Sequence, residues 1–545
     1  DGIIPVDAIC YDNLIMSNSC DLLHELILHA AQKTPHASAL RYQHEDLSYA
    51  ALALAVQSAG QLFLAQGIQR GERVAVYLEK RPETVAALYG ASYCGAVFVP
   101  VNPLLKADQV GHILRDCNVR LLVTSKDRLD ALRDVLATCP DLRQVLLVGL
   151  GGESLLGNIA IIPWQTSFTG ARVPYRSIDS DIAAILYTSG STGKPKGVVL
   201  SQRNMMAGAH SVAQYLENNA DDTILSVLPL SFDYGLSQLS TAFLTGACAV
   251  LMNYLLPRDI VKAVERYAIT GLAAVPPLWI QLSQLDWPEG ATQRLRYITN
   301  SGGAMPLATI DALRRALPKT KIYLMYGLTE AFRSTYLDPC ELERRPDSMG
   351  KAIPNAEILI VREDGTPCAA NEPGELVHRG ALVALGYWND PEKTAQRFKP
   401  VPNQEAGLPF PEMAVWSGDT VRRDEEGFLY FMGRRDDMIK TSGYRVSPSE
   451  VEEVAYRHPS VAEAVALGVP HSVLGQAIVL VVVSKSGESL DMEALVGICK
   501  QHLPAFMVPQ RVAFWQGSLP RNANGKIDRK RLTETFSETA TEPSA

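Results

Sequence analysis

The stretch from Tyr187 to Gly197 reads Tyr-Thr-Ser-Gly-Ser-Thr-Gly-Lys-Pro-Lys-Gly. It follows the apolar run Ile182–Leu186, which predicts a short buried strand, and precedes the β-rich run Val198–Leu200. Glycines let the backbone approach a ligand closely, and amide, hydroxyl and ammonium groups are the donors that a polyphosphate needs. A flexible Gly/Ser linker has a similar composition, but a linker rarely joins two ordered strands. We therefore predict a phosphate-binding loop.

This loop is not a Walker A loop, because the spacing Gly-x-x-x-x-Gly-Lys-Ser/Thr is absent and Pro195 follows Lys194. It resembles the signature loop of the adenylate-forming superfamily, which includes acyl-CoA synthetases, adenylation domains of peptide synthetases, and luciferases. The resemblance implies that the loop binds ATP. The residues implied are Thr188, Ser189, Gly190, Ser191, Thr192, Gly193, Lys194 and Lys196.

Length and composition indicate a soluble enzyme of more than one domain. The chain has 545 residues, 47% of them hydrophobic and 20% charged, which is too long for one ordinary core. Its net charge of −8 argues against a nucleic-acid partner. No apolar run reaches the roughly 18 residues that a membrane span needs. The nine cysteines include no Cys-x-x-Cys pair, so we expect free thiols in a reducing cytoplasm.

The order of predicted elements indicates an α/β fold. From Asp21 to about Val173, and again from Ile182 to about Met325, short apolar strands alternate with helical periodicity. This alternation predicts two layered α/β subdomains with mostly parallel sheets. After Met349 β-type segments dominate, so a β-rich subdomain follows. A compact α+β pattern then begins near residues 433–437 and predicts a small C-terminal domain.

We expect four segments along the chain. Residues 1–15 are an added or upstream extension, because Met16 begins a plausible natural start. Residues 16–435 are the N-terminal adenylation domain. Residues 436–536 are a mobile C-terminal lid domain that follows a hinge at Asp436. Residues 537–545 are a small, polar, disordered tail.

Other motifs of the superfamily follow the loop in order. Tyr326-Gly327-Leu328-Thr329-Glu330 comes directly after the apolar run Ile322–Met325. The resemblance implies that Tyr326 lies against adenine, Thr329 touches the α-phosphate and Glu330 holds Mg²⁺, which prefers oxygen ligands. Further nucleotide contacts are implied for the turn Ser301–Ala304, including Gly302 and Gly303, and for the ribose partners Asp419 and Arg434.

Two lysines are implied to act in different half-reactions. Lys526, on a loop that contains Gly525, matches the lysine that bridges the carboxylate and the α-phosphate during adenylation. Lys440 is implied to face the site after the small domain rotates about Asp436, with Gly443 lining the tunnel of a phosphopantetheine thiol. A solvated surface lysine is the ordinary alternative for an isolated Gly-Lys pair.

The acid to be activated depends on Asp233, in Leu-Ser-Phe-Asp-Tyr-Gly. Amino-acid-activating members carry an aspartate here that binds the substrate ammonium group, so we favour a small amino acid. Asp233 could instead cap the following helix, which leaves an amine-free carboxylic acid as the alternative. The implied pocket residues are Asp233, Tyr234, Ser237, Ala274, Thr299, Ser301, Met325, Arg333 and Ser334.

Two points stay open in the sequence. Arg333 departs from the apolar residue that the resemblance suggests, and it could meet a second carboxylate on the substrate or form a salt bridge elsewhere. The thiol could belong to a separate carrier protein or to CoA, and the chain resembles both prolyl-carrier-protein ligases and exosortase-associated acyl-CoA ligases. A luciferase-like oxidase and a catalytically silent scaffold are the more distant alternatives.

Overall fold

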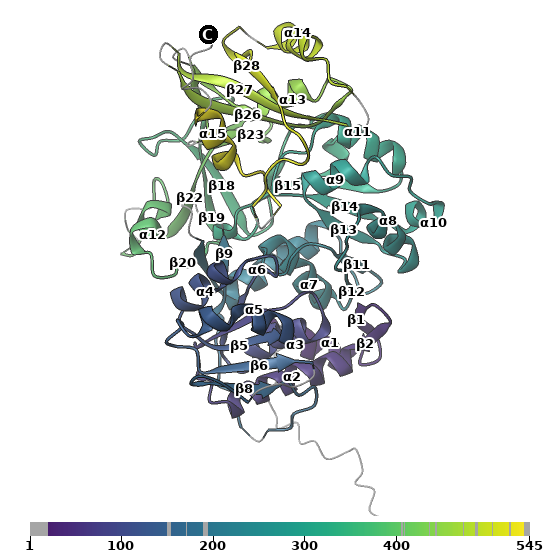
Figure 1. Ribbon diagram of the computed structural model, residues 1–545, viewed down its shortest axis with the longest axis vertical. Helices are drawn as coiled ribbons and strands as arrows, with labels where there is room; N and C mark the ends of the chain where they lie inside the picture. Colours follow the sequence, from purple (N-terminus) through teal and green to yellow (C-terminus); the bar gives the residue numbers. More distant parts are fainter. Residues whose placement is uncertain are drawn as a thin grey trace, which may run out of the picture.

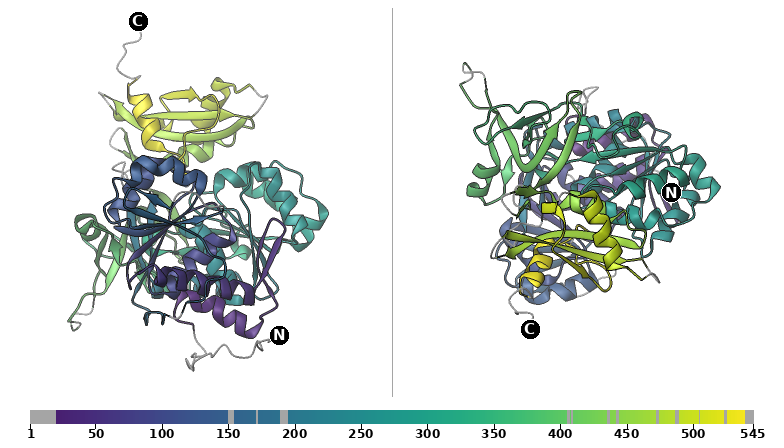
Figure 2. Two further views of the ribbon diagram at one scale, coloured as in Figure 1. Left: turned by 60° about the horizontal axis from the view of Figure 1, so that its bottom comes forward. Right: turned by 90° about the horizontal axis from the view of Figure 1, so that it is seen from above.

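The computed structural model describes residues 20–149, 154–170, 172–188, 195–404, 407, 409–434, 437–441, 444–471, 474–485, 489–503, 505–522 and 525–538. A large body holds two extensive sheets and a smaller third sheet, and the C-terminal part lies over one end of it (Figure 1). Figure 2 shows this C-terminal part as a separate cap above the body.

The first large sheet has nine strands, in the order β20-β10-β9-β4-β3-β5-β6-β8-β7. Its central strands β9, β4, β3, β5, β6 and β8 pair in parallel, as the alternating pattern predicts. The strands are β3 (Arg73–Tyr77), β4 (Val97–Pro100), β5 (Val119–Ser125), β6 (Gln144–Val148), β7 (Leu155–Leu156), β8 (Ile159–Pro163), β9 (Ile182–Thr188), β10 (Lys196–Ser201) and β20 (Gly386–Tyr387).

The second large sheet also has nine strands, in the order β17-β16-β15-β14-β13-β11-β12-β1-β2. The six strands from β15 to β1 pair in parallel. The strands are β1 (Ser38–Tyr42), β2 (Glu45–Ser48), β11 (Thr223–Ser226), β12 (Cys248–Leu251), β13 (Gly271–Ala274), β14 (Tyr297–Asn300), β15 (Lys321–Tyr326), β16 (Thr335–Leu337) and β17 (Lys351–Ala352).

The two sheets exchange strands, which the sequence did not predict. β9 and β10 come from the second α/β round but complete the first sheet, where β9 pairs with β4. β1 and β2 come from the first round but extend the second sheet through β12. The two predicted layers therefore exist, but each one draws strands from both rounds of the chain.

A layer of helices fills the space between the two sheets. Their apolar faces share one core with strands of both sheets, as Leu26, Val56, Leu88, Met205 and Leu239 show. The face predicted for the first helix is buried as expected, because Leu23, Leu26, Ile27 and Ala30 are all buried. The helices are α1 (Leu23–Lys33), α2 (Tyr49–Ala65), α3 (Pro82–Tyr93), α6 (Gln202–Tyr215) and α7 (Asp233–Thr245).

Other helices cover the outside of the sheets. α4 (Ala107–Asp116) and α5 (Lys126–Leu136) pack on the first sheet through a second core that includes Ile113 and Leu132. The helices beside the second sheet in Figure 1 are α8 (Pro257–Arg266), α9 (Pro276–Leu282), α10 (Glu289–Arg294) and α11 (Leu307–Ala316). Within the described residues, no helix is long and apolar enough to cross a membrane.

Two smaller sheets complete the molecule. The β-rich sheet contains β18 (Ala356–Val361), β19 (Gly374–Gly380), β21 (Phe398–Pro400), β22 (Met413–Arg423) and β23 (Leu429–Arg434), with α12 (Pro391–Arg397) beside it. The C-terminal sheet contains β24 (Ile439–Thr441), β25 (Tyr444–Val446), β26 (Val461–His471), β27 (Gly475–Ser484) and β28 (Arg511–Phe514), with α13 (Pro448–Ala455), α14 (Met492–His502) and α15 (Arg529–Glu538). The chain thus changes sheets between β23 and β24, the interval that contains the predicted boundary at residue 436.

Candidate active site

The predicted motifs meet at one edge of the second sheet. β13, β14 and β15 run parallel, so their carboxyl ends lie side by side. Asn300 ends β14 and is followed by the turn Ser301–Ala304, and Tyr326 ends β15 and is followed by Gly327–Glu330. Ligands of open α/β sheets bind outside the carboxyl ends of the strands. The fold therefore places two of the predicted motifs where a ligand is expected.

The predicted phosphate loop connects two paired strands. β9 and β10 are antiparallel, and Thr188 lies opposite Lys196 across the pair. Residues 189–194, the rest of the predicted loop, lie outside the described residues. The Nζ of Lys196 lies 3.7 Å from Oε1 of Glu330, so the end of this hairpin adjoins the loop after β15.

The buried carboxylate of Glu330 is the centre of a charged cluster, which we name the Glu330 cluster and define as Lys196, Glu330, Tyr387 and Arg397. The hydroxyl of Tyr387 donates to Oε1 of Glu330 at 2.5 Å, and Lys196 donates to the Tyr387 hydroxyl oxygen at 2.9 Å. Burial alone would raise the pKa of Glu330, but Arg397 and Lys196 lower it overall. Glu330 therefore stays ionised, as a ligand for a divalent cation must.

Arg397 brings a further positive charge to this cluster from the end of α12. A side chain at Gly418 would collide with its Nη1 at 2.7 Å, so the guanidinium packs tightly beside β22. Its buried Nε has no hydrogen-bond partner in the described part of the chain. A buried donor without a partner is costly unless a ligand satisfies it. Arg397 therefore suits an anionic ligand next to Glu330.

A second group of predicted residues meets around Asp419 on β22. The hydroxyl of Tyr326 donates a short hydrogen bond to Oδ2 of Asp419, and Nε of Arg434 lies 3.3 Å from its Oδ1. Burial, together with Asp419, raises the pKa of Tyr326 well above its usual value, so Tyr326 keeps its proton. The residues predicted to meet the base and the ribose of a nucleotide are therefore neighbours in the structure.

The C-terminal domain reaches the same edge through Lys526. Its Nζ lies 6.0 Å from the ring centroid of Phe232, and a Cβ at Gly302 would lie 3.4 Å from its Cε. Gly302 has φ +85°, a conformation that a larger residue would adopt only with strain. Burial lowers the pKa of Lys526, and Arg434 lowers it further, against the opposing effect of Asp233. Lys526 thus lies beside the turn after β14, within electrostatic reach of Arg434, Asp233, Asp419 and Glu330.

The predicted substrate residues form a block of mutually bonded side chains. Nη1 of Arg333 donates to Oδ2 of Asp233 at 2.9 Å, and its Nη2 donates to Oγ of Ser237 at 2.7 Å. The hydroxyls of Tyr234 and Thr299 are 2.5 Å apart, and the Arg333 guanidinium lies 4.7 Å from the centroid of the Tyr234 ring. We name these five residues the Asp233 cluster.

The other predicted pocket residues lie close by but bond elsewhere. The sulfur of Met325 accepts from Tyr215 at 3.0 Å, and the hydroxyl of Ser334 lies 2.9 Å from Nδ1 of His378. Ala274 and Ser301 are buried at the ends of β13 and β14. Gly303 and Ala304 are exposed in the turn after β14, and the position of a Cβ on Gly327 lies 3.3 Å from Cα of Arg333.

Several residues predicted to act in the second half-reaction lie outside the described part of the chain. Asp436 and Gly443 are not among the described residues, and of Lys440 the structure describes only its place in β24. The hinge, the thiol tunnel and the role of Lys440 stay predictions.

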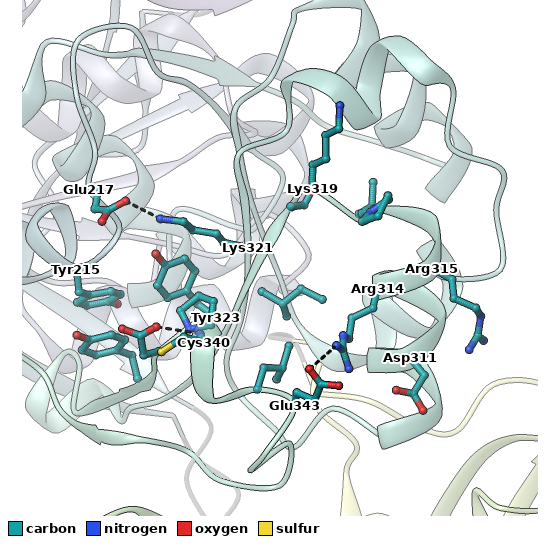
Figure 3. Close-up of a pocket in the computed structure, with 18 of the residues that line it drawn as sticks. Tyr215, Glu217, Asp311, Arg314, Arg315, Lys319, Lys321, Tyr323, Cys340 and Glu343 are labelled. Carbon is teal, nitrogen blue, oxygen red and sulfur yellow. Dashed lines mark hydrogen bonds and ion pairs between the residues drawn. The ribbon is translucent and has the colours of Figure 1, made fainter.

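A large hollow lies at the opposite end of β15. It has a volume of about 1170 Å³ and surrounds Lys321, where β15 begins, rather than Tyr326, where it ends (Figure 3). Two ion pairs line it, Lys321 with Glu217 at 2.8 Å and Arg314 with Glu343 at 3.5 Å (Figure 3). The convergence of the motifs, and not the size of a hollow, identifies the candidate site.

The sequence did not indicate that Tyr387 and Arg397 contribute to the site. Tyr387 is 57 residues from its partner Glu330, on an edge strand that joins the first sheet only through β10. Arg397 is the last residue of α12, a polar helix whose residue pattern is that of any exposed helix. Only the fold brings these two side chains to Glu330.

Family comparisons cover most of the chain. The model of the AMP-binding enzyme family matches residues 27–388, and the model of the AMP-binding enzyme C-terminal domain matches residues 450–526.

Individual relatives include both carrier-protein and CoA ligases. The chain is 30% identical to L-proline–[L-prolyl-carrier protein] ligase of Pseudomonas fluorescens, over 94% of this chain and 98% of that one. It is 28% identical to long-chain-fatty-acid–CoA ligase of Bacillus subtilis, over 95% of each. It is also 30% identical, over 94% of its length, to part of a linear gramicidin synthase of Brevibacillus parabrevis, but it spans only 6% of that much longer protein.

Solved structures show the same architecture. ATP-bound MatB from Rhodopseudomonas palustris aligns with a TM-score of 0.83 and 25% identity, over 95% of this chain and 99% of that one. The agreement extends over the large body and the C-terminal part together.

Proposed function

The chain belongs to the family of AMP-binding enzymes, and from that premise we propose that it joins a small carboxylic acid to a thiol by way of an acyl-adenylate. The observation that supports this proposal is the convergence of Lys196, Arg397, Arg434 and Lys526 on the carboxylates Glu330 and Asp419. Four cations around two carboxylates suit a nucleotide polyphosphate together with a divalent metal.

In the first half-reaction an oxygen of the substrate carboxylate attacks the α-phosphorus of ATP. The bond from that phosphorus to the bridging oxygen of the β-phosphate breaks, and pyrophosphate leaves. Lys526 holds the carboxylate against the α-phosphate and balances the charge that develops there. Lys196 and Arg397 balance the charge of the departing pyrophosphate. Tyr326, Asp419 and Arg434 hold the adenosine.

Glu330 fits the Mg²⁺ that such a reaction uses. It is a buried carboxylate whose pKa is lowered by nearby cations, and Tyr387 fixes its orientation. Mg²⁺ bound there would neutralise phosphate charge.

In the second half-reaction a thiol attacks the acyl carbon and AMP leaves with the bridging oxygen. We propose that the C-terminal domain rotates about Asp436, withdraws Lys526 and brings Lys440 to the site, with Gly443 lining the path of the thiol. A phosphopantetheine arm of a separate carrier protein and CoA both offer this thiol. A carrier protein would dock through a modest and transient interface.

Two classes of substrate suit this chemistry. A small amino acid would present its ammonium group to Asp233, whereas an amine-free acid would not. The choice depends on what surrounds Asp233.

Substrate-dependent ATP–pyrophosphate exchange tests the proposal. The protein with Mg²⁺ is expected to exchange labelled pyrophosphate into ATP only when a suitable carboxylic or amino acid is present. Mg²⁺ removal is expected to abolish the exchange. Exchange without any acid, or none with any acid in a broad panel, would contradict adenylate formation.

A further inference from the structure

Asp233 and Arg333 are among the most deeply buried charged residues that the structure describes. Their side chains are 4% and 2% exposed, respectively, and they form an ion pair at 2.9 Å. The hydroxyl of Thr329 approaches the other oxygen, Oδ1, of Asp233 at 3.3 Å. Both carboxylate oxygens of Asp233 therefore have donors that the chain itself supplies. Asp233 is the first residue of α7. It does not cap this helix, because Phe232 is at the N-cap position and no side-chain capping bond is present.

The unsatisfied atom in this pair is a donor. Nε of Arg333 is buried and has no hydrogen-bond partner in the described part of the molecule, whereas its Nη1 and Nη2 bond to Asp233 and Ser237. A ligand oxygen could accept from Nε, but an ammonium group could not, because it has only protons to offer. The pair is therefore suited to an acceptor and not to a cation.

A strained turn holds Arg333 in this position. Phe332 has φ +54° and ψ −41°, and the N–H of Arg333 donates to the carbonyl oxygen of Ala331 at 2.6 Å across it. A three-residue turn of this kind is rare and unfavourable for a residue with a side chain. It lies between Glu330 and Arg333, so the same turn orients one residue toward each cluster.

The pair also lies beside the reacting groups. Thr329, which contacts Asp233, immediately precedes Glu330, and Phe232, which lies under Lys526, immediately precedes Asp233. The acyl part of a substrate whose carboxylate meets Lys526 must therefore extend from this point, close to Asp233.

We infer that Arg333 is a specificity-determining residue which neutralises Asp233 and thereby selects small carboxylic acids without an α-ammonium group. An incoming ammonium ion would have to displace Arg333, which would leave a guanidinium buried without its partner. An amine-free acid requires no such rearrangement. This inference rests on the proposed function and narrows it to the amine-free class.

The test measures ATP–pyrophosphate exchange with matched acid pairs that differ only in the amine: alanine and propionate, serine and 3-hydroxypropionate, proline and cyclopentanecarboxylate. The wild type is expected to prefer the amine-free member of at least one pair by about tenfold or more. Arg333→Met, which exposes the charge of Asp233 to the substrate, is expected to shift that ratio toward the amino acid by about tenfold. Arg314→Met, an exposed arginine far from the site, is the matched control.

A double variant, Asp233→Leu with Arg333→Met, covers the case in which the single variant does not fold. It replaces both members of the ion pair by apolar side chains, a change that is often neutral for the stability of a protein. This variant is expected to keep the preference for the amine-free acid. A wild type that prefers amino acids would overturn the inference, as would a folded Arg333→Met protein with an unchanged ratio or a double variant that prefers amino acids. Where a different acid of the broad panel drives exchange, its own amino-acid counterpart completes the pair; if no acid of the panel drives exchange, the proposed function itself fails and the inference falls with it.

Discussion

The Glu330 cluster and the Asp233 cluster lie on either side of one short turn, yet they differ in how their charges are balanced. The Glu330 cluster holds one carboxylate against Lys196 and Arg397, and the side chain of Lys196 is 25% exposed. The Asp233 cluster holds one carboxylate against one guanidinium that is 2% exposed. An excess of accessible positive charge suits a charged ligand that comes and goes, whereas a closed neutral pair suits the uncharged part of a substrate.

The largest effect is expected from unbalancing the closed cluster. Asp233→Ala leaves Arg333 buried without its partner and is expected to lower the free energy of unfolding by about 3–5 kcal/mol. Urea denaturation measures this loss. Glu217→Ala, which removes the exposed pair with Lys321, serves as the control and is expected to stay close to the wild type. Equal losses in the two variants would remove the distinction between buried and exposed pairs.

The next largest effect concerns Lys526, the lysine that the C-terminal domain brings to the site. Lys526→Ala is expected to slow adenylation about 10²–10³-fold, because a charge aimed at the transition state is lost. Conversion of supplied acyl-adenylate to thioester is expected to be spared, since the proposed domain rotation withdraws Lys526 from that step. Lys500→Ala, an exposed lysine of the same domain, is the control. Equal loss of both steps would contradict the assignment of Lys526.

A smaller effect is expected within the Glu330 cluster. Arg397→Gln removes a charge that lowers the pKa of Glu330, so that pKa rises toward its usual range. Glu330 then begins to take up a proton at a higher pH, and the acid limb of the pH–exchange profile is expected to move to higher pH. Exchange at neutral pH is expected to fall about tenfold. An acid limb that does not move would mean that Arg397 does not act on Glu330.

The lowered pKa of Glu330 also makes the stability of the fold depend on pH. The pKa of Glu330 is lowered in the folded state, so its contribution to stability is present above its unfolded pKa and is lost as the pH falls through the folded value. Arg397→Gln raises the folded pKa toward the unfolded value and so shrinks this contribution. Stability at neutral pH is therefore expected to fall, while the additional loss on acidification becomes smaller, which denaturation midpoints at neutral and acidic pH measure.

The smallest effect is expected at the exposed edge of the site. The side chain of Arg434 is 56% exposed, and its Nε lies 3.3 Å from Oδ1 of Asp419. Because solvent weakens an exposed ion pair, Arg434→Gln is expected to leave the free energy of unfolding within about 1 kcal/mol of the wild type. It is expected to raise the KM for ATP several-fold without a matching change in kcat. A large loss of stability would instead assign this pair to the closed type.

The sequence predicted local features well. The apolar face of α1, the strands β9 and β15, and the turn that follows β15 lie where periodicity and motif order placed them. Such features depend on residues close together in the chain.

The pairings across the fold could not be predicted. Asp233 and Arg333 are 100 residues apart, and no local pattern shows that their charges cancel. The pairing of β1 and β2 with the second sheet likewise depends on packing, because the sequence of an edge strand does not specify which sheet it joins. Arg333 stood out in the sequence as an unexpected residue, but only the structure identified its partner.

The central claim, that a carboxylate attacks the α-phosphorus of ATP, can be tested by following oxygen. The protein is given ATP, Mg²⁺, a thiol acceptor and an accepted acid labelled with ¹⁸O in its carboxylate, and the products are analysed by mass spectrometry. The account predicts unlabelled pyrophosphate and AMP that carries one ¹⁸O from the acid. Labelled inorganic phosphate together with ADP would contradict it, since the attack would then have fallen on the γ-phosphorus.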